Sequence, residues 1–461
     1  MFDRLVPPAL TDAALQHLQQ CGVQRGAIVA WLGHNSWDML ATLVACERIG
    51  AVLLPLNGRL APAELARIFT HAGAGHLLGT PDAEKLAAEV LALARLESGP
   101  TDGPTDGMTD GQTDGPTDDV KDGDLLLVYT SGTTGAPKGA MHTRAGLQAG
   151  VLAAIAAQGL NAHSRVLSVL PLFHVGGLCI QTLPALAVGA RVQLHRRFDA
   201  DAWFDAVASW RPTTTLLVPA VMKALIDHPR WAGADLSSLA FVNSGSQIVP
   251  RALIDAFHAR GVPVAQVYGA TETGPVSIVL HPAEAVAHAG MAGRPALGVQ
   301  LRLAADGEIL LKAPNLMRGY HRSPEPSVDA EGWFHTGDLA RMHAGGLIEV
   351  VGRSKEVIIS GGENIHPAEV EELVAAMPGV AACAVVGLPD VRWGEVPALA
   401  VVRAATVDGT TLDAATIAKT LAMRLARFKV PTKIVFLATL PRTALGKVQR
   451  SAVQALILRK S

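Results

Sequence analysis

Short apolar runs alternate with helix-like stretches along most of this chain, and the alternation limits the folds that are open to it. Ala27–Leu32 and Ala51–Leu54 have the pattern of buried strands, whereas Trp37–Ile49, which ends at Gly50, has the pattern of a helix. Strands that are joined through helices form parallel sheets, because the crossover helix returns the chain to the same end of the sheet. We therefore expect an α/β fold over residues 11–280.

The pattern changes near residue 295. Short alternating segments there, such as Glu308–Lys312, predict a small β-rich subdomain, and beyond it strands and helices alternate again. We expect a large N-terminal domain of βα subdomains that includes the β-rich subdomain, over residues 1–352, and a small α+β C-terminal domain over residues 356–461. The boundary between them is expected at residues 353–355.

The composition is that of a folded globular chain, with 461 residues of which 49% are hydrophobic and 17% charged. Lysine and arginine total 39 against 41 aspartates and glutamates, which gives a net charge of −2. A nucleic-acid or anionic-membrane binder needs a basic excess, so we expect neither partner. The most apolar segment, Val175–Val188, is interrupted by Gln181 and Pro184 and is too short to span a bilayer.

Cysteine usage and the N-terminus both favour a cytoplasmic location. The N-terminal residues have no basic region followed by an apolar one, so no secretory signal is expected. The cysteines are far apart and form no C-x-x-C pair, which argues against a zinc site or a disulfide framework and favours reduced thiols. They are Cys21, Cys46, Cys179 and Cys383.

Residues 101–119 form an acidic repeat with the pattern TDGx. Glycine and proline disfavour regular structure there, and no apolar face is present to be buried. We expect a solvated, flexible surface loop. A calcium-binding repeat is a weaker interpretation, because such repeats interleave apolar residues that build a core.

A turn rich in glycine and hydroxyl side chains follows the strand-like segment Asp124–Thr130. Glycines let backbone N–H groups approach an anion, hydroxyls donate hydrogen bonds, and Lys138 adds a positive charge. The turn therefore suits a polyphosphate. It is not the common P-loop, because Pro137 precedes the lysine and Gly139 follows it, and it does not match the dinucleotide fingerprint.

This turn, SGTTGAPKG, resembles the phosphate loop of the adenylate-forming superfamily, which comprises acyl-CoA synthetases, adenylation domains of peptide synthetases, and luciferases. Six further motifs resemble those of the superfamily, in the same order along the chain. Within it, the chain is similar to the acyl-CoA synthetase branch and to 4-chlorobenzoate–CoA and o-succinylbenzoate–CoA ligases. The further motifs are Pro171–His174, Ser244–Ser246, Tyr268–Thr273, Trp333–Asp338, Gly352–Lys355 and Pro441–Lys447.

The resemblance implies an AMP-forming carboxylic acid–CoA ligase that uses ATP, Mg²⁺ and coenzyme A. A carboxylate first attacks the α-phosphate of ATP, giving acyl-AMP and pyrophosphate, and the CoA thiolate then attacks the acyl carbon and releases AMP. Both steps develop charge on oxygen, so cations and hydrogen-bond donors must be positioned in advance. The resemblance also implies that the nucleotide lies between a large N-terminal lobe and a mobile C-terminal lobe.

By the same resemblance, Lys447 brings the substrate carboxylate and the α-phosphate together, and Glu272 binds Mg²⁺ with help from Thr130. Asp338 accepts hydrogen bonds from both ribose hydroxyls, and Arg353 reaches the ribose or a phosphate. The other residues that the resemblance assigns to the nucleotide are Ser131, Gly132, Thr133, Thr134, Gly135, Lys138, Ser244, Gly245, Ser246, Tyr268, Gly269, Ala270 and Thr271.

The acid pocket is expected to have small, apolar walls, with His174 as a wall or gate and not as a general base, because a carboxylate is already ionised near neutral pH. Such walls suit an aromatic or cyclic acid or a short chain. The residues expected there are His174, Val175, Gly176, Val218, Val221, Gly269 and Gly274.

The C-terminal domain is expected to swing about Lys355. One pose presents Lys447 for adenylation, and the other presents the segment after Ser360 for thioester formation. The residues that the resemblance assigns to CoA are Gly361, Gly362, Trp393, Phe428 and Lys429.

Several alternatives stay open from the sequence. The acid could be o-succinylbenzoate, whose second carboxylate would need a cation near its binding site. The chain could be a stand-alone adenylation enzyme that loads a carrier protein, a luciferase-like oxygenase, or a non-catalytic nucleotide sensor. Its state could be a monomer or a homodimer.

Overall fold

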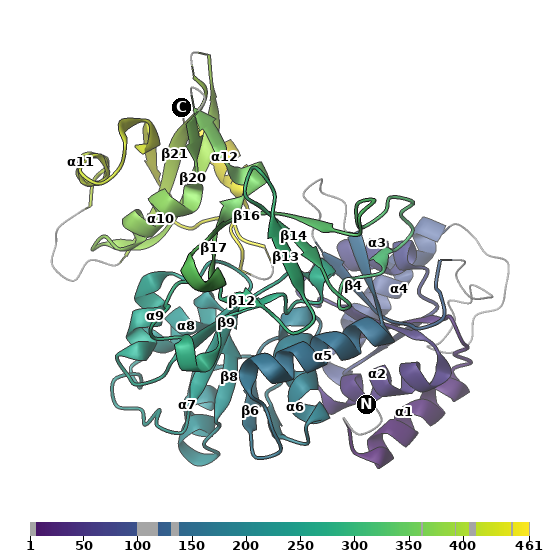
Figure 1. Ribbon diagram of the computed structural model, residues 1–461. Helices are drawn as coiled ribbons and strands as arrows, with labels where there is room; N and C mark the ends of the chain where they lie inside the picture. The colour runs from purple at the N-terminus through teal and green to yellow at the C-terminus, as the bar shows by residue number, and fades with distance from the viewer. Residues whose placement is uncertain are drawn as a thin grey trace. The chain divides into compact units, whose positions relative to one another are not determined.

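The computed structural model describes residues 6–98, 119–130, 138–360, 363–391, 393–404, 412–443 and 446–460. The expected loop at 101–119 lies outside these residues except for its last one. The chain divides into two compact units (Figure 1). Unit 1 comprises Met1–Val249, Leu253–Leu301 and Leu311–Phe334, and unit 2 comprises Pro250–Ala252, Arg302–Leu310 and His335–Ser461. The expected hinge lies within unit 2, and its role stays a prediction.

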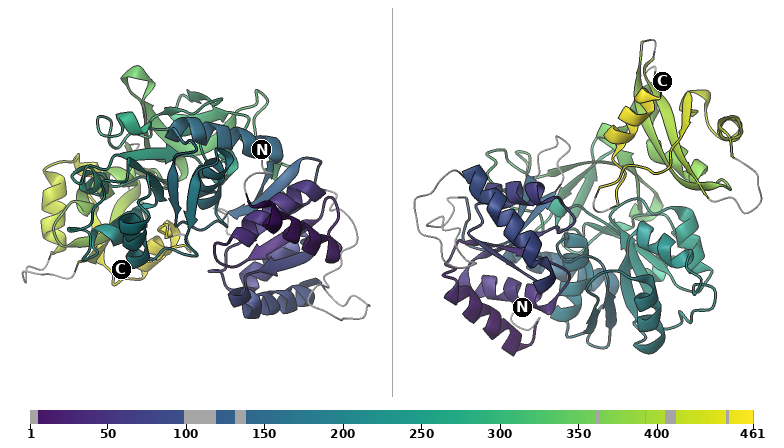
Figure 2. Two further views of the ribbon diagram at one scale, coloured as in Figure 1. Left: turned by 90° about the horizontal axis from the view of Figure 1, so that it is seen from below. Right: turned by 180° about the vertical axis from the view of Figure 1, so that it is seen from behind.

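The first sheet of unit 1 has six strands in the order β15-β5-β4-β2-β1-β3. β1, β2, β3 and β4 pair in parallel, whereas β5 pairs antiparallel with β4 and with β15. Helices lie on both faces of this sheet (Figure 2, left). The strands are β1 (Ile28–Leu32), β2 (Val52–Leu56), β3 (His76–Gly79), β4 (Asp124–Thr130), β5 (Lys138–Thr143) and β15 (Gly319–Tyr320), and the helices are α1 (Pro8–Gln20), α2 (Trp37–Ile49), α3 (Pro62–Ala72) and α4 (Glu84–Ser98).

Burial of both faces explains why β1 and β2 are continuously apolar in sequence. Val29 and Trp31 belong to one core cluster, with residues of α1 and α2, whereas Ile28 and Ala30 belong to another, with residues of α3 and α4. Alternate residues of a strand point to opposite faces, so a strand covered by helices on both sides has no polar positions. The expected parallel α/β fold is confirmed.

The second sheet of unit 1 has seven strands in the order β12-β11-β10-β9-β8-β6-β7. β7, β6, β8, β9 and β10 are parallel, and β11 and β12 add an antiparallel edge. The strands are β6 (Arg165–Ser168), β7 (Arg191–Leu194), β8 (Thr214–Leu217), β9 (Phe241–Gly245), β10 (Val264–Tyr268), β11 (Ile278–Val279) and β12 (Arg294–Pro295), and the associated helices are α5 (Arg144–Gln158), α6 (Leu183–Ala187), α7 (Ala200–Ser209), α8 (Pro219–Ile226) and α9 (Arg251–His258).

The β-rich subdomain predicted after residue 295 is a four-stranded sheet in the order β13-β14-β16-β17, and most of it belongs to unit 2. A five-stranded sheet, β19-β18-β21-β20 with β22 beside β21, forms the rest of the unit with three helices. The elements are β13 (Gln300–Leu303), β14 (Glu308–Lys312), β16 (Phe334–Met342), β17 (Ile348–Arg353), β18 (Ile358–Ser360), β19 (Glu363–Ile365), β20 (Val380–Asp390), β21 (Gly394–Arg403), β22 (Lys433–Phe436), α10 (Pro367–Ala375), α11 (Ala414–Ala422) and α12 (Arg450–Arg459).

The sequence predicts a helix over Thr11–Gln20 with Thr11 as its N-cap, and the structure differs at this boundary. Helix α1 begins at Pro8, and Thr11 is buried inside it. Proline is favoured in the first turn because its missing N–H has no helical partner there. None of the helices in the described ranges is both long and apolar enough to cross a bilayer.

Candidate active site

The hairpin of β4 and β5 fixes both ends of the predicted phosphate turn. Thr130 is the last residue of β4 and pairs with Lys138, the first residue of β5. The Thr130 hydroxyl donates a hydrogen bond to the Lys138 carbonyl at 3.5 Å. The turn residues expected to contact phosphate between them, Ser131, Gly132, Thr133, Thr134 and Gly135, lie outside the described residues.

Tyr320 contacts the two charged groups predicted to bind the nucleotide and its metal ion. Its hydroxyl donates a hydrogen bond to Glu272 Oε1 at 2.9 Å. The Lys138 ammonium lies 5.0 Å from the centroid of its ring, within the range of a cation–π contact. Burial, with a further contribution from the negative charge of Glu272, raises the pKa of Tyr320, so the phenol stays a neutral donor. The structure thus brings Lys138 and Glu272 together around one ring.

None of the sequence motifs predicts Tyr320 as a site residue. It lies on β15, which pairs with β5 so that Tyr320 stands opposite Ala140. It is 48 residues from Glu272 in the chain. The pairing of the two-residue edge strand β15 with β5 places Tyr320 where it contacts Lys138 and Glu272.

The turn that presents Glu272 is held by its neighbours. The Ala270 N–H donates to Thr273 Oγ1 at 2.8 Å, and the Glu272 carbonyl accepts from the Met317 N–H at 2.8 Å. Gly274, which ends the turn, has φ +74°, and a Cβ there would lie 2.2 Å from the Asn315 carbonyl oxygen. A glycine is therefore required by both conformation and space.

Glu272 offers a carboxylate to a metal ion in this part of the site. Within the described ranges there is no group of three or more His, Cys, Asp or Glu side chains that could hold a metal by itself. Mg²⁺ needs few protein ligands, because phosphate and water oxygens complete its octahedral shell. A single oriented carboxylate that shares the Tyr320 ring with Lys138 therefore fits Mg²⁺ bound together with a nucleotide.

The predicted adenine and acid-pocket residues follow the carboxyl ends of neighbouring parallel strands. Ser244 and Gly245 end β9, Tyr268 ends β10, and Val218 follows β8. Ligands of open α/β sheets bind at this edge. The buried Ser244 hydroxyl faces inward and donates to Met222 Sδ at 3.3 Å, whereas the exposed Ser246 has a positive φ of 74°. Such backbone strain is common at ligand sites.

The predicted gate, His174, lies in the loop after β6, the strand beside β8. Its Nδ1 accepts a hydrogen bond from the Gly176 N–H at 3.0 Å. Val175 and Gly176 are buried, and Gly176 begins a π-helical segment, Gly176–Thr182. π-Helical segments are rare and are frequent at functional sites. Val221 lies on α8 and Gly269 follows Tyr268, so the expected acid-pocket residues gather at one edge of the second sheet.

In unit 2, Asp338 and Arg353 face each other on paired strands. They are cross-strand partners on β16 and β17, and Arg353 Nε lies 2.8 Å from Asp338 Oδ1. The Asp338 residue is 6% exposed. The preceding Gly337 N–H donates to Glu308 Oε1 at 2.8 Å, which fixes the strand locally. The two residues predicted to contact the ribose are thus adjacent.

Lys447 lies in a tight turn just before α12. The Thr443 N–H donates to the Lys447 carbonyl at 2.7 Å, and the Lys447 N–H donates to Thr443 Oγ1 at 3.2 Å. Arg450, the first residue of α12, forms ion pairs with Glu356 at 2.9 Å and Glu371. The turn is therefore anchored within its own unit only three residues from the lysine.

The residues predicted to bind CoA differ in exposure and in their contacts. Trp393 and Phe428 are exposed, at 47% and 37%. The Lys429 ammonium contacts both carboxylate oxygens of Glu369, at 2.7 and 2.8 Å. Gly361 and Gly362 lie outside the described residues, and the backbone of Lys355 lies in a 3₁₀ turn, Ser354–Glu356. The roles of all these residues stay predictions.

The carboxyl edge of a parallel sheet is where α/β proteins bind nucleotides, and an oriented carboxylate beside a lysine fits a polyphosphate with its metal ion. The fold and this site therefore define a nucleotide-binding α/β enzyme.

Comparison with known proteins identifies the family. The chain belongs to the AMP-binding enzyme family: residues 10–321 match the AMP-binding enzyme family, and residues 369–447 match the AMP-binding enzyme C-terminal domain. This confirms the adenylate-forming resemblance and the expected fold of a large N-terminal and a small C-terminal domain.

Individual relatives are CoA ligases or related enzymes. The chain is 44% identical to an indoleacetate–CoA ligase of Aromatoleum aromaticum, with 98% of this chain and 92% of the relative covered. It is 42% identical to a feruloyl-CoA synthase of an Amycolatopsis species, with 95% and 90% covered. Among solved structures, the amide bond synthetase McbA of Marinactinospora thermotolerans has a TM-score of 0.84 and 28% identity, with 97% and 93% covered. The predicted class, an AMP-forming acyl-CoA synthetase that uses ATP and CoA, is confirmed.

Proposed function

We propose that this chain joins an aromatic carboxylic acid to coenzyme A through an acyl-adenylate. The acid carboxylate attacks the α-phosphate of ATP and displaces pyrophosphate, and the CoA thiolate then displaces AMP. The single observation that supports this best is that Lys138 and Glu272 both contact Tyr320. The aromatic class is supported by the relatives, which are named for indoleacetate and ferulate.

In the adenylation step, the Lys138 ammonium and the turn N–H groups hold the polyphosphate. Glu272 would hold Mg²⁺, with Thr130 assisting, and bound Mg²⁺ supplies positive charge that offsets the charge of the departing pyrophosphate. Tyr320 keeps the Glu272 carboxylate oriented through its 2.9 Å hydrogen bond. This preorganisation matters because donors that are already in place need no reorientation as charge develops.

The remaining roles are assigned to the two units separately. In unit 1, His174 and the small residues around it form the wall of the acid pocket. In unit 2, Asp338 accepts hydrogen bonds from the ribose, Arg353 holds that carboxylate, and Lys447 lowers the repulsion between the substrate carboxylate and the α-phosphate. Two anions in contact repel strongly at low dielectric, so a cation shared between them lowers the barrier.

In the thioester step, we propose that unit 2 reorients about Lys355 and presents its CoA residues. Gly361 and Gly362 lack a Cβ and so leave room for a narrow pantetheine arm. Trp393 and Phe428 offer exposed rings, and Lys429 offers a cation for a phosphate once Glu369 is displaced.

A pyrophosphate-release screen tests the proposal. Benzoates, arylacetates, aryl-acrylates, o-succinylbenzoate and short fatty acids are each added with ATP, Mg²⁺ and CoA, and the thioester is measured by chromatography. We expect release and thioester with aromatic acids, and weak activity with short fatty acids. Carrier-protein thiol is compared with CoA in the same assay. Absence of release with every acid, or release that never yields acyl-CoA, would contradict the proposal.

A further inference from the structure

Asn35 joins the two sheets of unit 1 through its side chain. It lies in the loop between β1 and α2, at the carboxyl end of a strand of the first sheet. Its side-chain amide bonds to the loops that follow β6 and β7 of the second sheet, at residues 135 and 160 positions further along the chain. Asn35 is only 6% exposed, so this link between the two sheets is shielded from water.

Two hydrogen bonds of this amide flank Pro171, the first residue of the motif that contains His174. Asn35 Nδ2 donates to the Leu170 carbonyl at 2.9 Å, and Asn35 Oδ1 accepts from the Leu172 N–H at 2.8 Å. A neighbouring parallel strand would bond to the same two groups, because a residue in a parallel pair bonds to the residues before and after its partner. The Asn35 amide therefore takes the place of a strand partner for Pro171, beyond the end of β6.

Further hydrogen bonds hold Asn35 itself. Its Nδ2 also donates to the His195 carbonyl at 2.9 Å, and its backbone N–H donates to the Arg196 carbonyl at 3.1 Å. An asparagine amide has two N–H donors and one acceptor oxygen, and all three groups are used here. Aspartate has nearly the same shape but can donate to at most one of the two carbonyls that this amide serves.

The position of Pro171 in turn sets the position of residues expected in the wall of the acid pocket. The Pro171 carbonyl accepts from the His174 N–H at 3.3 Å. It also lies so close to Gly177 that a Cβ there would be 2.3 Å from the carbonyl oxygen. The loop is thus folded tightly against the start of the π-helical segment, and a shift of Pro171 would displace His174 and this segment together.

We propose that Asn35 is a positioning residue for the acid pocket, and that its amide holds Pro171, and through it His174, where the substrate acid requires them. Asn35 acts through the loop and does not bind the acid. The inference rests on the proposed function, because it takes the loop after β6 as a wall of the acid pocket. It adds a residue of the first sheet to a pocket that is otherwise assigned to the second.

The test separates binding of the acid from binding of ATP. Asn35→Ala is assayed by pyrophosphate release with indole-3-acetate, or with another aromatic acid if the screen shows that acid to be used better. We expect KM for the acid to rise about tenfold or more and KM for ATP to stay within about threefold, because without the amide only a fraction of the molecules holds the loop in the binding position. A merely structural role would not give this result, since loss of folded protein lowers the maximal rate and leaves KM unchanged.

Asn35→Asp tests the two donors without changing the size of the side chain. It keeps an acceptor for the Leu172 N–H but places an oxygen against at least one of the carbonyls of Leu170 and His195. We expect KM for the acid to rise at least about threefold. If Asn35→Ala does not fold, as judged by circular dichroism, this variant replaces it.

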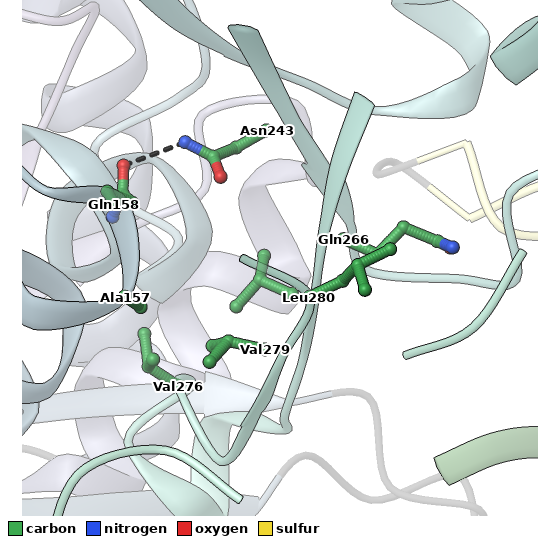
Figure 3. A pocket seen from close by; sticks show the side chains of 8 residues that line it. Ala157, Gln158, Asn243, Gln266, Val276, Val279 and Leu280 are labelled. Carbon is green, nitrogen blue, oxygen red and sulfur yellow. Dashed lines mark hydrogen bonds between the residues drawn. The ribbon is translucent and has the colours of Figure 1, made fainter. Parts of the chain in front are cut away.

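Gln266 on β10 provides a matched control, because it is a buried amide of the second sheet that bonds to a different loop. Its Nε2 donates to the Met291 carbonyl at 2.8 Å, and Figure 3 shows its side chain directed away from Gln158 and Asn243. Gln266→Leu also removes a buried hydrogen bond, so it should lower the free energy of unfolding without raising KM for the acid.

Two results would overturn the inference. One is an unchanged KM for the acid in the Asn35 variants, and the other is an equal rise of KM for the acid and for ATP. Either result leaves the proposed function intact, since the unaltered protein still converts the acid. Failure of the proposed function has a different signature, because no aromatic acid would then give pyrophosphate release and acyl-CoA with the unaltered protein.

Discussion

Tyr320 links an acidic and a basic residue that lie far apart in the sequence. Its hydroxyl orients the Glu272 carboxylate, and its ring lies beside the Lys138 ammonium. The sequence predicts Lys138 and Glu272 as site residues because a short recognisable motif surrounds each. Tyr320 has no such motif, since its place in the site comes from strand pairing and not from its neighbours in the chain.

Tyr320→Phe removes the hydroxyl and keeps the ring. We expect kcat/KM for acid-dependent pyrophosphate release to fall about 3- to 20-fold, because Glu272 loses one orienting hydrogen bond. In Tyr320→Leu, which also removes the contact with Lys138, kcat/KM should fall further. Activities of the two variants equal to that of the unaltered protein would show that Tyr320 does not position the carboxylate.

Lys447→Ala is expected to slow adenylation at least about a hundredfold, since the cation that offsets carboxylate–phosphate repulsion is lost. Thioester formation from supplied acyl-AMP should change little, because the carboxylate is already joined to the α-phosphate and the repulsion that Lys447 offsets has been overcome. Both half-reactions are measured separately by pyrophosphate release and by acyl-CoA formation. Lys419→Ala, on the exposed face of α11, serves as the control. Equal losses in both half-reactions would refute the assigned role.

At the scale of elements, the turn after β10 is predictable in part. The motif Tyr268–Thr273 predicts a ligand loop, and the structure places it beside Ser244–Ser246 because β9 and β10 are parallel neighbours. The contact of Gly274 with Asn315 could not be predicted, since it depends on how a distant loop packs on the turn. The predicted start of α1 was wrong, because Pro8 competes with Thr11 as the first-turn residue.

Gly274→Ala tests the packing of this turn. Its positive φ and the carbonyl oxygen 2.2 Å from the place that a Cβ would occupy both oppose a side chain, so we expect a loss of about 2–4 kcal/mol in the free energy of unfolding. Gly290→Ala is the matched control, because Gly290 has φ +96° and no atom within 4 Å of its Cβ position. Urea unfolding of both variants separates the steric clash with the Asn315 carbonyl from the cost of a positive φ. Equal losses in the free energy of unfolding for the two variants would argue against a clash.

His142 on β5 predicts a pH dependence of stability. Burial lowers the pKa of His142 from the ordinary 6.5 to about 4. A hydrogen bond with the Thr271 backbone acts in the opposite direction and raises the pKa. The unfolded chain therefore binds the proton first as pH falls. Neutral His142 therefore contributes fully to the free energy of unfolding above pH 6.5. This contribution is lost as pH falls from 6.5 to about 4, which lowers the free energy of unfolding by about 3 kcal/mol.

Urea unfolding of the unaltered protein and of His142→Gln across this pH range measures the effect. The variant should show a shallower decline in the free energy of unfolding toward pH 4. His163→Gln, at an exposed loop position, is the control and should decline as the unaltered protein does. Parallel curves for all three proteins would show that His142 does not titrate in this way.

At the scale of the whole molecule, the sequence predicts the class of fold well, because buried parallel strands and amphipathic helices have distinct periodicities. The α/β region, the β-rich segment after residue 295 and the final α+β segment are all present. The sequence pattern did not predict which of the two compact units contains the β-rich sheet. Arg302–Leu310 and residues 335–353 belong to the same compact unit as the C-terminal residues, and tertiary contacts that define such a unit leave no periodic pattern in the sequence.

The most direct measurement is mass spectrometry of reactions with ATP, Mg²⁺ and an aromatic acid, quenched before and after CoA is added. The account predicts acyl-AMP and pyrophosphate before CoA, and acyl-CoA with AMP afterwards. ADP with inorganic phosphate, or thioester formation without any adenylate, would contradict it.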